Sequence, residues 1–275
     1  SGDNIIFAAG IENNDVKTGA GDNIILAAGI NQSSVETGEG ANLILNAANR
    51  SIITTGNGDD TIVSIAVGTG SEDASNQNEA SGDSHVDAHE GDNFVVSLGY
   101  NSLVETGSGD DIIISSARNS EIKAGDGNNI LFGGAHQNIM TSGSGDDFVL
   151  SGIANQSTIS TGAGNDTIIS LGWSVLSSMM ESVSESVGNF VDEAKEAIQG
   201  MFNFGNDFIN IADTSYVDDL ISSLDFSFIE FDFTKFVSED SILKLQDTIE
   251  AGAGDDYIIG GAGEDILKGK AGDDT

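Results

Sequence analysis

A short glycine-rich motif of the form G-x-G-x-D/N, followed by aliphatic residues, returns every 18 or 19 residues apart from two longer intervals. The first glycine of the motif stands at Gly19, Gly38, Gly56, Gly107, Gly125, Gly143, Gly162 and Gly252, and His89 takes its place in one copy. A period of this size is one supersecondary unit, which buries its apolar face only by stacking on its neighbours. The repeat therefore predicts a solenoid.

Two columns of aliphatic residues keep register with the motif. One column lies six residues after the glycine, at Ile25, Ile44, Ile62, Val95, Ile113, Leu131, Val149, Ile168 and Ile258. The other lies three residues before it, at Val16, Val35, Ile53, Val86, Val104, Ile122, Met140, Ile159 and Ile249. We expect two short strands and two turns per repeat, with one inward residue in each strand. A β-sandwich would not keep this register, and the glycine density and β-branched content disfavour helix.

The C-terminal stretch "GAGDDYIIGGAGEDILKGKAGDDT", residues 252–275, holds three consecutive nonapeptides of the form G-G-x-G-x-D-x-U-x. It resembles the RTX (repeats-in-toxin) calcium-binding proteins. The resemblance implies an all-β fold, a right-handed parallel β-roll or β-solenoid with coils of about 18 residues and several bound Ca²⁺ ions. In the earlier repeats the second turn, as in "ARNSEIKAG", carries Asn, Gln and Ser instead of Gly and Asp. We therefore expect one calcium row and one polar row, with both rows calcium-binding only in the last nonapeptides.

The spacing of stacked coils suits calcium. Parallel strands lie about 4.8 Å apart, close to twice a calcium–oxygen distance of about 2.3–2.6 Å. The resemblance implies a side-chain ligand at the sixth nonapeptide position, which holds Asp60, Asp111, Asp147, Asp166, Asp256, Asp265 and Asp274. Asn stands there at Asn4, Asn23, Asn42, Asn93 and Asn129, where we expect weaker sites because Asn brings oxygen without charge.

Neighbouring residues complete the candidate metal sites. The candidate ligands at the fifth position are Asp22, Asp59, Asp92, Asp110 and Asp146. The turn glycines are Gly19, Gly21, Gly56, Gly58, Gly107, Gly109, Gly125, Gly127, Gly143, Gly145, Gly162, Gly164, Gly252 and Gly254. The copy with Ala41 fits the motif least well. Solvated turn residues are the alternative, but the in-register repetition favours Ca²⁺, and Mg²⁺ prefers shorter bonds and retained waters.

The charge restricts the partners. The chain has 45 acidic and 9 basic side chains, a net charge of -36 and no Cys. We expect this charge to exclude nucleic-acid phosphates as partners and to disfavour anionic membranes, and no apolar run approaches the roughly 18 residues of a membrane-spanning helix. Because self-repulsion opposes folding, we expect Ca²⁺ binding and folding to be one event, a coil-to-β transition.

The solenoid pattern is interrupted twice. We expect a calcium-binding β-solenoid over residues 1–172 with a loop at about 68–84, and an amphipathic helical insertion over 173–200. An irregular α/β insertion with a short solenoid-like strand follows over 201–240, and the RTX β-roll resumes over 241–275. The helix, whose apolar residues recur at three and four over 174–199, is expected to pack on the solenoid or a partner. The aromatic-rich segment 226–236 either fills the core or forms a contact surface.

No enzymatic site is expected. His85 and His89 with Asp87 and Glu90 suggest a transition-metal cluster, but we interpret this grouping as coincidence because nothing makes the four side chains converge. Neither HExxH nor G-x-S-x-G occurs. An ice-binding face is disfavoured, because the third motif position holds no uniform rank: Ala20, Glu39, Asn57, Glu90, Ser108, Asp126, Ser144 and Ala163.

The function expected from these patterns is structural. We interpret the chain as an extracellular or cell-surface, calcium-stabilised segment of a large bacterial protein, such as an adhesin stalk, an S-layer or a filament subunit. Both ends stop within a motif, so we expect coils to continue beyond them and the solenoid to stack head to tail. The alternative is a calcium-dependent folding and secretion module of a type I secreted toxin or enzyme, as the RTX resemblance implies.

Overall fold

The computed structural model describes residues 2–10, 13–29, 32–66, 83–99, 101–115, 119–134, 137–152, 157–170, 246–261 and 264–275. These residues form two parallel β-sheets and no helix, so none of them belongs to a helix able to cross a membrane. The first sheet, sheet A, contains β1 (Ile5–Gly10), β3 (Ile24–Gly29), β5 (Leu43–Ala48), β7 (Thr61–Ala66), β9 (Phe94–Leu98), β11 (Ile112–Ser115), β13 (Ile130–Gly133), β15 (Phe148–Ser151), β17 (Thr167–Ser170) and β19 (Tyr257–Ile259). The second, sheet B, contains β2 (Asn13–Lys17), β4 (Gln32–Glu36), β6 (Arg50–Thr54), β8 (Ser84–Asp87), β10 (Ser102–Glu105), β12 (Glu121–Lys123), β14 (Ile139–Thr141), β16 (Thr158–Ala163), β18 (Thr248–Ala253) and β20 (Ile266–Ala271).

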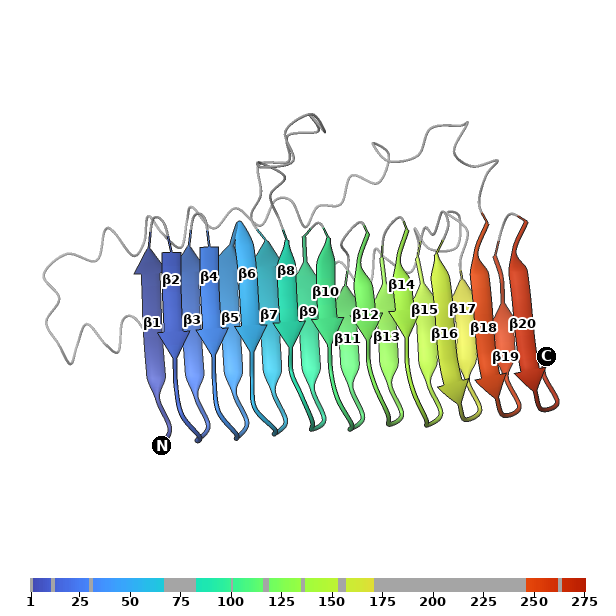
Figure 1. Ribbon diagram of the computed structural model, residues 1–275, viewed down its shortest axis with the longest axis horizontal. Helices are drawn as coiled ribbons and strands as arrows, with labels where there is room; N and C mark the ends of the chain where they lie inside the picture. Colours follow the sequence, from blue (N-terminus) through green and yellow to red (C-terminus); the bar gives the residue numbers. More distant parts are fainter. Residues whose placement is uncertain are drawn as a thin grey trace, which may run out of the picture. The chain divides into compact units, whose positions relative to one another are not determined.

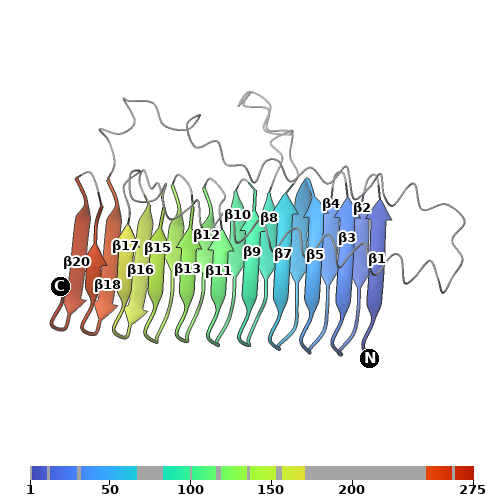
Figure 2. The ribbon, with the colours of Figure 1, turned by 180° about the vertical axis from the view of Figure 1, so that it is seen from behind.

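The chain alternates between the two sheets. Odd-numbered strands pair with each other in sequence order in sheet A, and even-numbered strands do the same in sheet B (Figures 1 and 2). Each coil is therefore one odd strand, a turn, one even strand and a second turn. Register follows the repeat: Ile112 pairs with Ile130 in sheet A, and Val104 with Ile122 in sheet B. The prediction of an all-β parallel solenoid with coils of 18 or 19 residues is confirmed.

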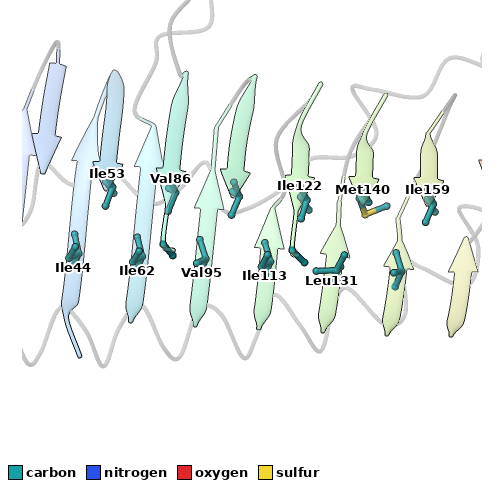
Figure 3. Packing of buried hydrophobic residues seen from close by; sticks show 14 of the residues in the cluster. Ile44, Ile53, Ile62, Val86, Val95, Ile113, Ile122, Leu131, Met140 and Ile159 are labelled. Carbon is teal, nitrogen blue, oxygen red and sulfur yellow. The ribbon is translucent and has the colours of Figure 1, made fainter. Parts of the chain in front are cut away.

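The core lies between the sheets and consists of the two predicted columns. Sheet A contributes side chains such as Ile44, Ile113 and Leu131, which are 0% exposed, and sheet B contributes Ile122 and others (Figure 3). Full burial of an aliphatic side chain contributes about 1.5–3 kcal/mol, so every coil is held by a few such contacts. Each coil touches only its neighbours, which makes stability a sum of local terms along the solenoid.

The outward faces of the two sheets differ. Sheet A carries apolar residues outward, including Ile112 and Ile130, which are 37% and 36% exposed. Sheet B carries charged residues that pair between adjacent coils, such as Lys17 with Glu36 at 2.7 Å. Sheet B also exposes apolar side chains, such as Ile52 at 54%, so the two faces differ in their charge pairs rather than in apolar surface.

Both interruptions of the repeat lie between an odd strand and the next even strand. Residues 67–82 follow β7 and residues 171–245 follow β17, and both strands belong to sheet A. The pairing resumes without a change of register, since Thr61 pairs with Phe94 and Thr167 with Tyr257. The predicted helix at 174–199, the solenoid-like strand within 201–240 and the aromatic segment 226–236 lie outside the described residues.

Candidate metal centre

The predicted calcium-binding turns lie together along one edge of the solenoid, at the bottom in Figure 1. We call this row the acidic edge. It consists of the six-residue segments that lead from each even strand to the next odd strand: 18–23, 37–42, 55–60, 88–93, 106–111, 124–129, 142–147, 161–166 and 251–256. Within a segment, positions two and four are the motif glycines, and positions five and six hold the Asp and Asn residues.

The glycines at position four are required by the stacking of the coils. Gly109 adopts a φ of +138°, which L side chains rarely take, and a Cβ there would lie 2.2 Å from the carbonyl oxygen of Gly91 in the preceding coil. The next coil repeats this arrangement with Gly127 against Gly109. A line of backbone carbonyl oxygens therefore runs along the acidic edge.

Position six forms a buried ladder along the whole edge. From Asn42 to Asp274, the Oδ1 atom of each Asp or Asn accepts a hydrogen bond from the backbone N–H of position six in the preceding coil, over 2.8–3.3 Å. The ladder crosses both interruptions, since Asp60 N–H donates to Asn93 and Asp166 N–H donates to Asp256. Its members from Asn23 to Asp256 are at most 2% exposed. They are Asn23, Asn42, Asp60, Asn93, Asp111, Asn129, Asp147, Asp166 and Asp256.

The second oxygen of each of these buried Asp side chains has no hydrogen-bond partner. The atoms concerned are Oδ2 of Asp60, Asp111, Asp147, Asp166 and Asp256. A buried carboxylate oxygen without a partner costs free energy unless a cation or a proton neutralises it. Five such oxygens in one row, beside a line of carbonyl oxygens, form the donor set that Ca²⁺ prefers.

Burial also changes the protonation of several carboxyl groups on the acidic edge. It raises the pKa of Asp111 to about 6, although the hydrogen bond from the backbone N–H of Asn93 opposes the change. Burial likewise raises the pKa values of Asp60, Asp147 and Asp166, and the flanking Asp147 and Asp256 charges raise that of Asp166 further. The acidic edge therefore disfavours the negative charge that it carries, as expected of a site that a cation completes.

Position five forms a second ladder, which is exposed and runs in the opposite direction. Its Oδ1 atoms accept from the backbone N–H of position five in the following coil, over 2.7–2.9 Å. The predicted site residues Asp22, Asp59, Asp92, Asp110 and Asp146 all lie here. Ala41 offers no side-chain oxygen, so the doubtful copy interrupts this ladder. The structure thus places positions five and six on one edge but gives them different surroundings.

The opposite edge has another chemistry. We call it the polar edge; it consists of the turns that lead from each odd strand to the next even strand. Buried hydroxyl and amide groups pair across it, as in Ser64 with Ser84 at 2.7 Å and Asn46 Nδ2 with Ser51 Oγ at 2.5 Å. Such groups both donate and accept, so these pairs form without a cation, although Oδ1 of Asn46 and the hydroxyls of Ser115 and Ser151 have no hydrogen-bond partner. This agrees with the prediction of a polar row opposite the acidic one.

Asp265 lies on the polar edge, away from the other predicted ligands. Its Oδ1 accepts from the backbone N–H of Asp247 at 3.0 Å. The sequence prediction missed Asp247, which is 3% exposed. It is the Asp of "LQDTIE", residues 245–250, and stands two residues before the inward Ile249 as a sixth nonapeptide position does, but no motif glycine precedes it. Unlike the acidic-edge carboxylates, Asp247 is satisfied by protein groups, because Ser157 N–H donates to Oδ1 at 3.0 Å and Ser170 Oγ to Oδ2 at 2.5 Å.

The histidine grouping considered from sequence is split between two contacts. His85 Nε2 lies 3.4 Å from Glu105 Oε2, and His89 Nδ1 lies 3.0 Å from Asp87 Oδ1. In the described ranges, no three His, Asp or Glu side chains converge on a point that could hold a metal ion. A cation on the acidic edge would therefore need backbone carbonyl oxygens as well as carboxylates.

A family model described as the RTX calcium-binding nonapeptide repeat matches the chain in four copies, at residues 87–117, 116–149, 156–172 and 246–275. The chain contains RTX calcium-binding repeats. RTX repeats typically bind Ca²⁺, and the partnerless Oδ2 atoms of the acidic edge fit that ion by their chemistry. The matched ranges begin at residue 87, so the coils with Asn4, Asn23 and Asn42 lie outside them. Comparisons with curated proteins and with solved structures give no match.

Proposed function

We propose that the chain is a calcium-stiffened structural segment of a large bacterial protein that works outside the cell, as an adhesin stalk, an S-layer or a filament subunit. The observation that carries this proposal is the row of buried carboxylate oxygens without protein partners, which a bound cation would neutralise and thereby stabilise the solenoid. Calcium is scarce inside cells and abundant outside them, so such a chain would fold after export. RTX repeats are typical of secreted proteins, which supports this location.

In this proposal Ca²⁺ would be held by side chains and backbone together. Oδ2 of Asp60, Asp111, Asp147, Asp166 and Asp256 would bind it with the carbonyl oxygens of the glycine turns. The ion would supply positive charge between coils and would lower the repulsion within a chain of net charge -36. Its contribution is mechanical and thermodynamic, and we assign the chain no catalytic role. We also take the coils to be right-handed, as parallel crossover connections almost always are.

Head-to-tail association is part of the same proposal. Leu267 in β20 occupies an inward position, in register with Ile249 in β18, yet it is 46% exposed while Ile249 is 0% exposed. Its side chain and the unpaired backbone of β20 would be covered by one more coil. We propose that this coil comes from further solenoid, either in the same protein or in a second copy.

Electron microscopy of the purified chain with Ca²⁺ and with a chelator tests this function. We expect ordered rods or filaments with Ca²⁺ and none with the chelator. Particles without ordered rods or filaments under both conditions would contradict the structural proposal.

The second candidate is a folding and secretion module of a type I secreted toxin or enzyme. It is favoured by the RTX match at residues 246–275, where Asp256 and Asp274 hold position six in successive coils of the acidic edge. This candidate predicts calcium-dependent folding without polymers, so the same micrographs, taken together with circular dichroism, separate the two.

A further inference from the structure

The position-six side chains differ between coils in a single atom. Oδ1 accepts the ladder hydrogen bond in Asp and Asn coils alike. The second terminal atom is Nδ2, a donor, in Asn4, Asn23, Asn42, Asn93 and Asn129, and Oδ2, an acceptor, in the Asp coils. The acidic edge therefore contains a carboxylate in some coils and an amide in others, at the same position of the repeat.

In the Asn coils this atom is fully used by the protein. Nδ2 of Asn42 donates to the carbonyl oxygen of Gly40 at 2.8 Å and to Oδ1 of Asp60 at 2.9 Å. Nδ2 of Asn129 donates to the carbonyl oxygen of Gly127 at 3.0 Å. The amide thus brings partial positive charge to the carbonyl oxygens of its own turn, which is the charge that a cation would otherwise supply.

In the Asp coils the corresponding atom has the opposite character. Oδ2 of Asp111 stands at the place in its coil that Nδ2 of Asn129 takes in the next, and it finds no donor. The same holds for the other four buried Asp side chains of the ladder. An acceptor beside carbonyl oxygens is stable only when a cation lies between them.

We propose that position six decides, coil by coil, whether the solenoid takes calcium, and that the Asn amide replaces the ion. Coils with Asp bind Ca²⁺, whereas coils with Asn bind none and are held without metal. This replaces the expectation of weak calcium sites at Asn, and it rests on the proposed calcium-stiffened function.

The order of Asp and Asn at position six then divides the acidic edge into three parts. The first three coils have only Asn, at Asn4, Asn23 and Asn42. From Asp60 to Asp147 the two types alternate, so that an amide separates each pair of carboxylates. From Asp147 onward every coil has Asp. Calcium demand therefore increases toward the C-terminal coils.

Two reciprocal substitutions in adjacent coils of the full chain test the proposal. D111N should lower the number of Ca²⁺ ions bound, measured by isothermal titration with Ca²⁺ alone, by one. In chelator it should raise the Tm by several degrees, because an amide donor replaces the partnerless oxygen. N129D should do the reverse, with one more ion bound and a Tm that falls in chelator and recovers with Ca²⁺.

The control is D15N, which removes one negative charge from the exposed outward face of β2. It should leave the number of bound ions unchanged, which separates the position-six effect from the general loss of charge. Circular dichroism with saturating Ca²⁺ verifies folding of each variant.

The outcomes distinguish this inference from the proposed function. If the wild-type chain binds no Ca²⁺, the proposed function itself fails. If it binds Ca²⁺ but D111N binds the same number, or folded N129D gains no ion, the inference fails while the function stands. An N129D chain that stays unfolded with saturating Ca²⁺ also contradicts it, because Asp occupies successive coils from Asp147 onward.

Discussion

The first coils and the last coils share one backbone but satisfy it by different means. In both, Gly turns stack directly and the inward residues are aliphatic, as at Ile44 and Ile168, which are each 0% exposed. They differ at position six, where Asn23 and Asn42 donate to their own turns while Asp166 and Asp256 each leave a buried oxygen without a donor. The core therefore sets the fold, and the acidic edge sets the conditions under which each part of it is stable.

This difference follows from hydrogen-bond chemistry rather than from the amount of apolar burial. An amide and a carboxylate have almost the same shape, so exchanging them changes no packing. They differ in whether the second terminal atom of the side chain needs a bound cation. A chain built this way can keep one part ordered at low calcium and make the rest depend on the ion.

The largest expected effect is a difference in protection between the two regions when calcium is removed. Hydrogen exchange of the full chain in chelator should retain protection of the amides of residues 23–29 and 42–48. It should lose protection of residues 147–151 and 166–170, because the adjacent carboxylates are then uncompensated. Mass spectrometry of peptic fragments from samples with and without Ca²⁺ measures both regions in one experiment.

Equal loss of protection at both regions would contradict this comparison. It would mean that the coils unfold as one cooperative unit, with the metal acting on the whole solenoid. Repeat proteins, in which each coil contacts only its neighbours, allow the graded result.

The sequence was sufficient to predict the coil, because its period fixes the alignment of every aliphatic column. Val104 and Ile113 were placed inward by spacing alone, and both are 0% exposed. The sequence also predicted one acidic and one polar edge, since Asn and Ser replace the acids at alternate turns.

What the sequence could not predict was the state of individual atoms. Fifth and sixth positions look alike as "DD", yet Asp110 is exposed and Asp111 is 0% exposed. The sixth side chain bonds to the buried backbone of the preceding coil, whereas the fifth lies on the exposed ladder. Asp247 was missed because its half-motif lacks the flanking glycines. Its partner Ser170 is 77 residues away in the chain, and only the fold brings the two together.

Alanine at a position-four glycine should destabilise both regions, whether or not calcium is present. In G109A the methyl group would meet the carbonyl oxygen of Gly91 at a φ of +138°, and in G40A it would meet Gly21 at +125°. We expect each substitution to cost roughly 2–4 kcal/mol, from backbone strain and overpacking together. Thermal unfolding with Ca²⁺ and with chelator checks this. A calcium-dependent cost for G40A would contradict the view that its coil is metal-free.

The pH dependence of the chelated chain gives a smaller effect. The pKa of Asp111 is raised to about 6 in the folded state, above its ordinary value, so folding takes up a proton there. Stability from this group is complete below about pH 4 and is lost as the pH rises through about 6, by up to roughly 3 kcal/mol. Denaturant unfolding in chelator between pH 4 and 7 measures it. D111N is the matched control, and it should flatten this part of the profile; an unchanged slope would contradict the assignment.

The smallest effect concerns a carboxylate of the opposite kind. Glu250 on the outward face of sheet B accepts from Lys268 at 2.6 Å and lies 2.9 Å from Lys270, and these bonds lower its pKa to about 2. Its contribution is therefore present above the ordinary Glu pKa and is lost as the pH falls toward 2, the reverse of Asp111. Because the pair is exposed, salt should weaken it. E250Q should leave the profile between pH 4 and 7 unchanged and reduce only the loss of stability below pH 4. A change of the E250Q profile near pH 6 would show that the two kinds of carboxylate are coupled, and would contradict the separation of the acidic edge from the charged face of sheet B.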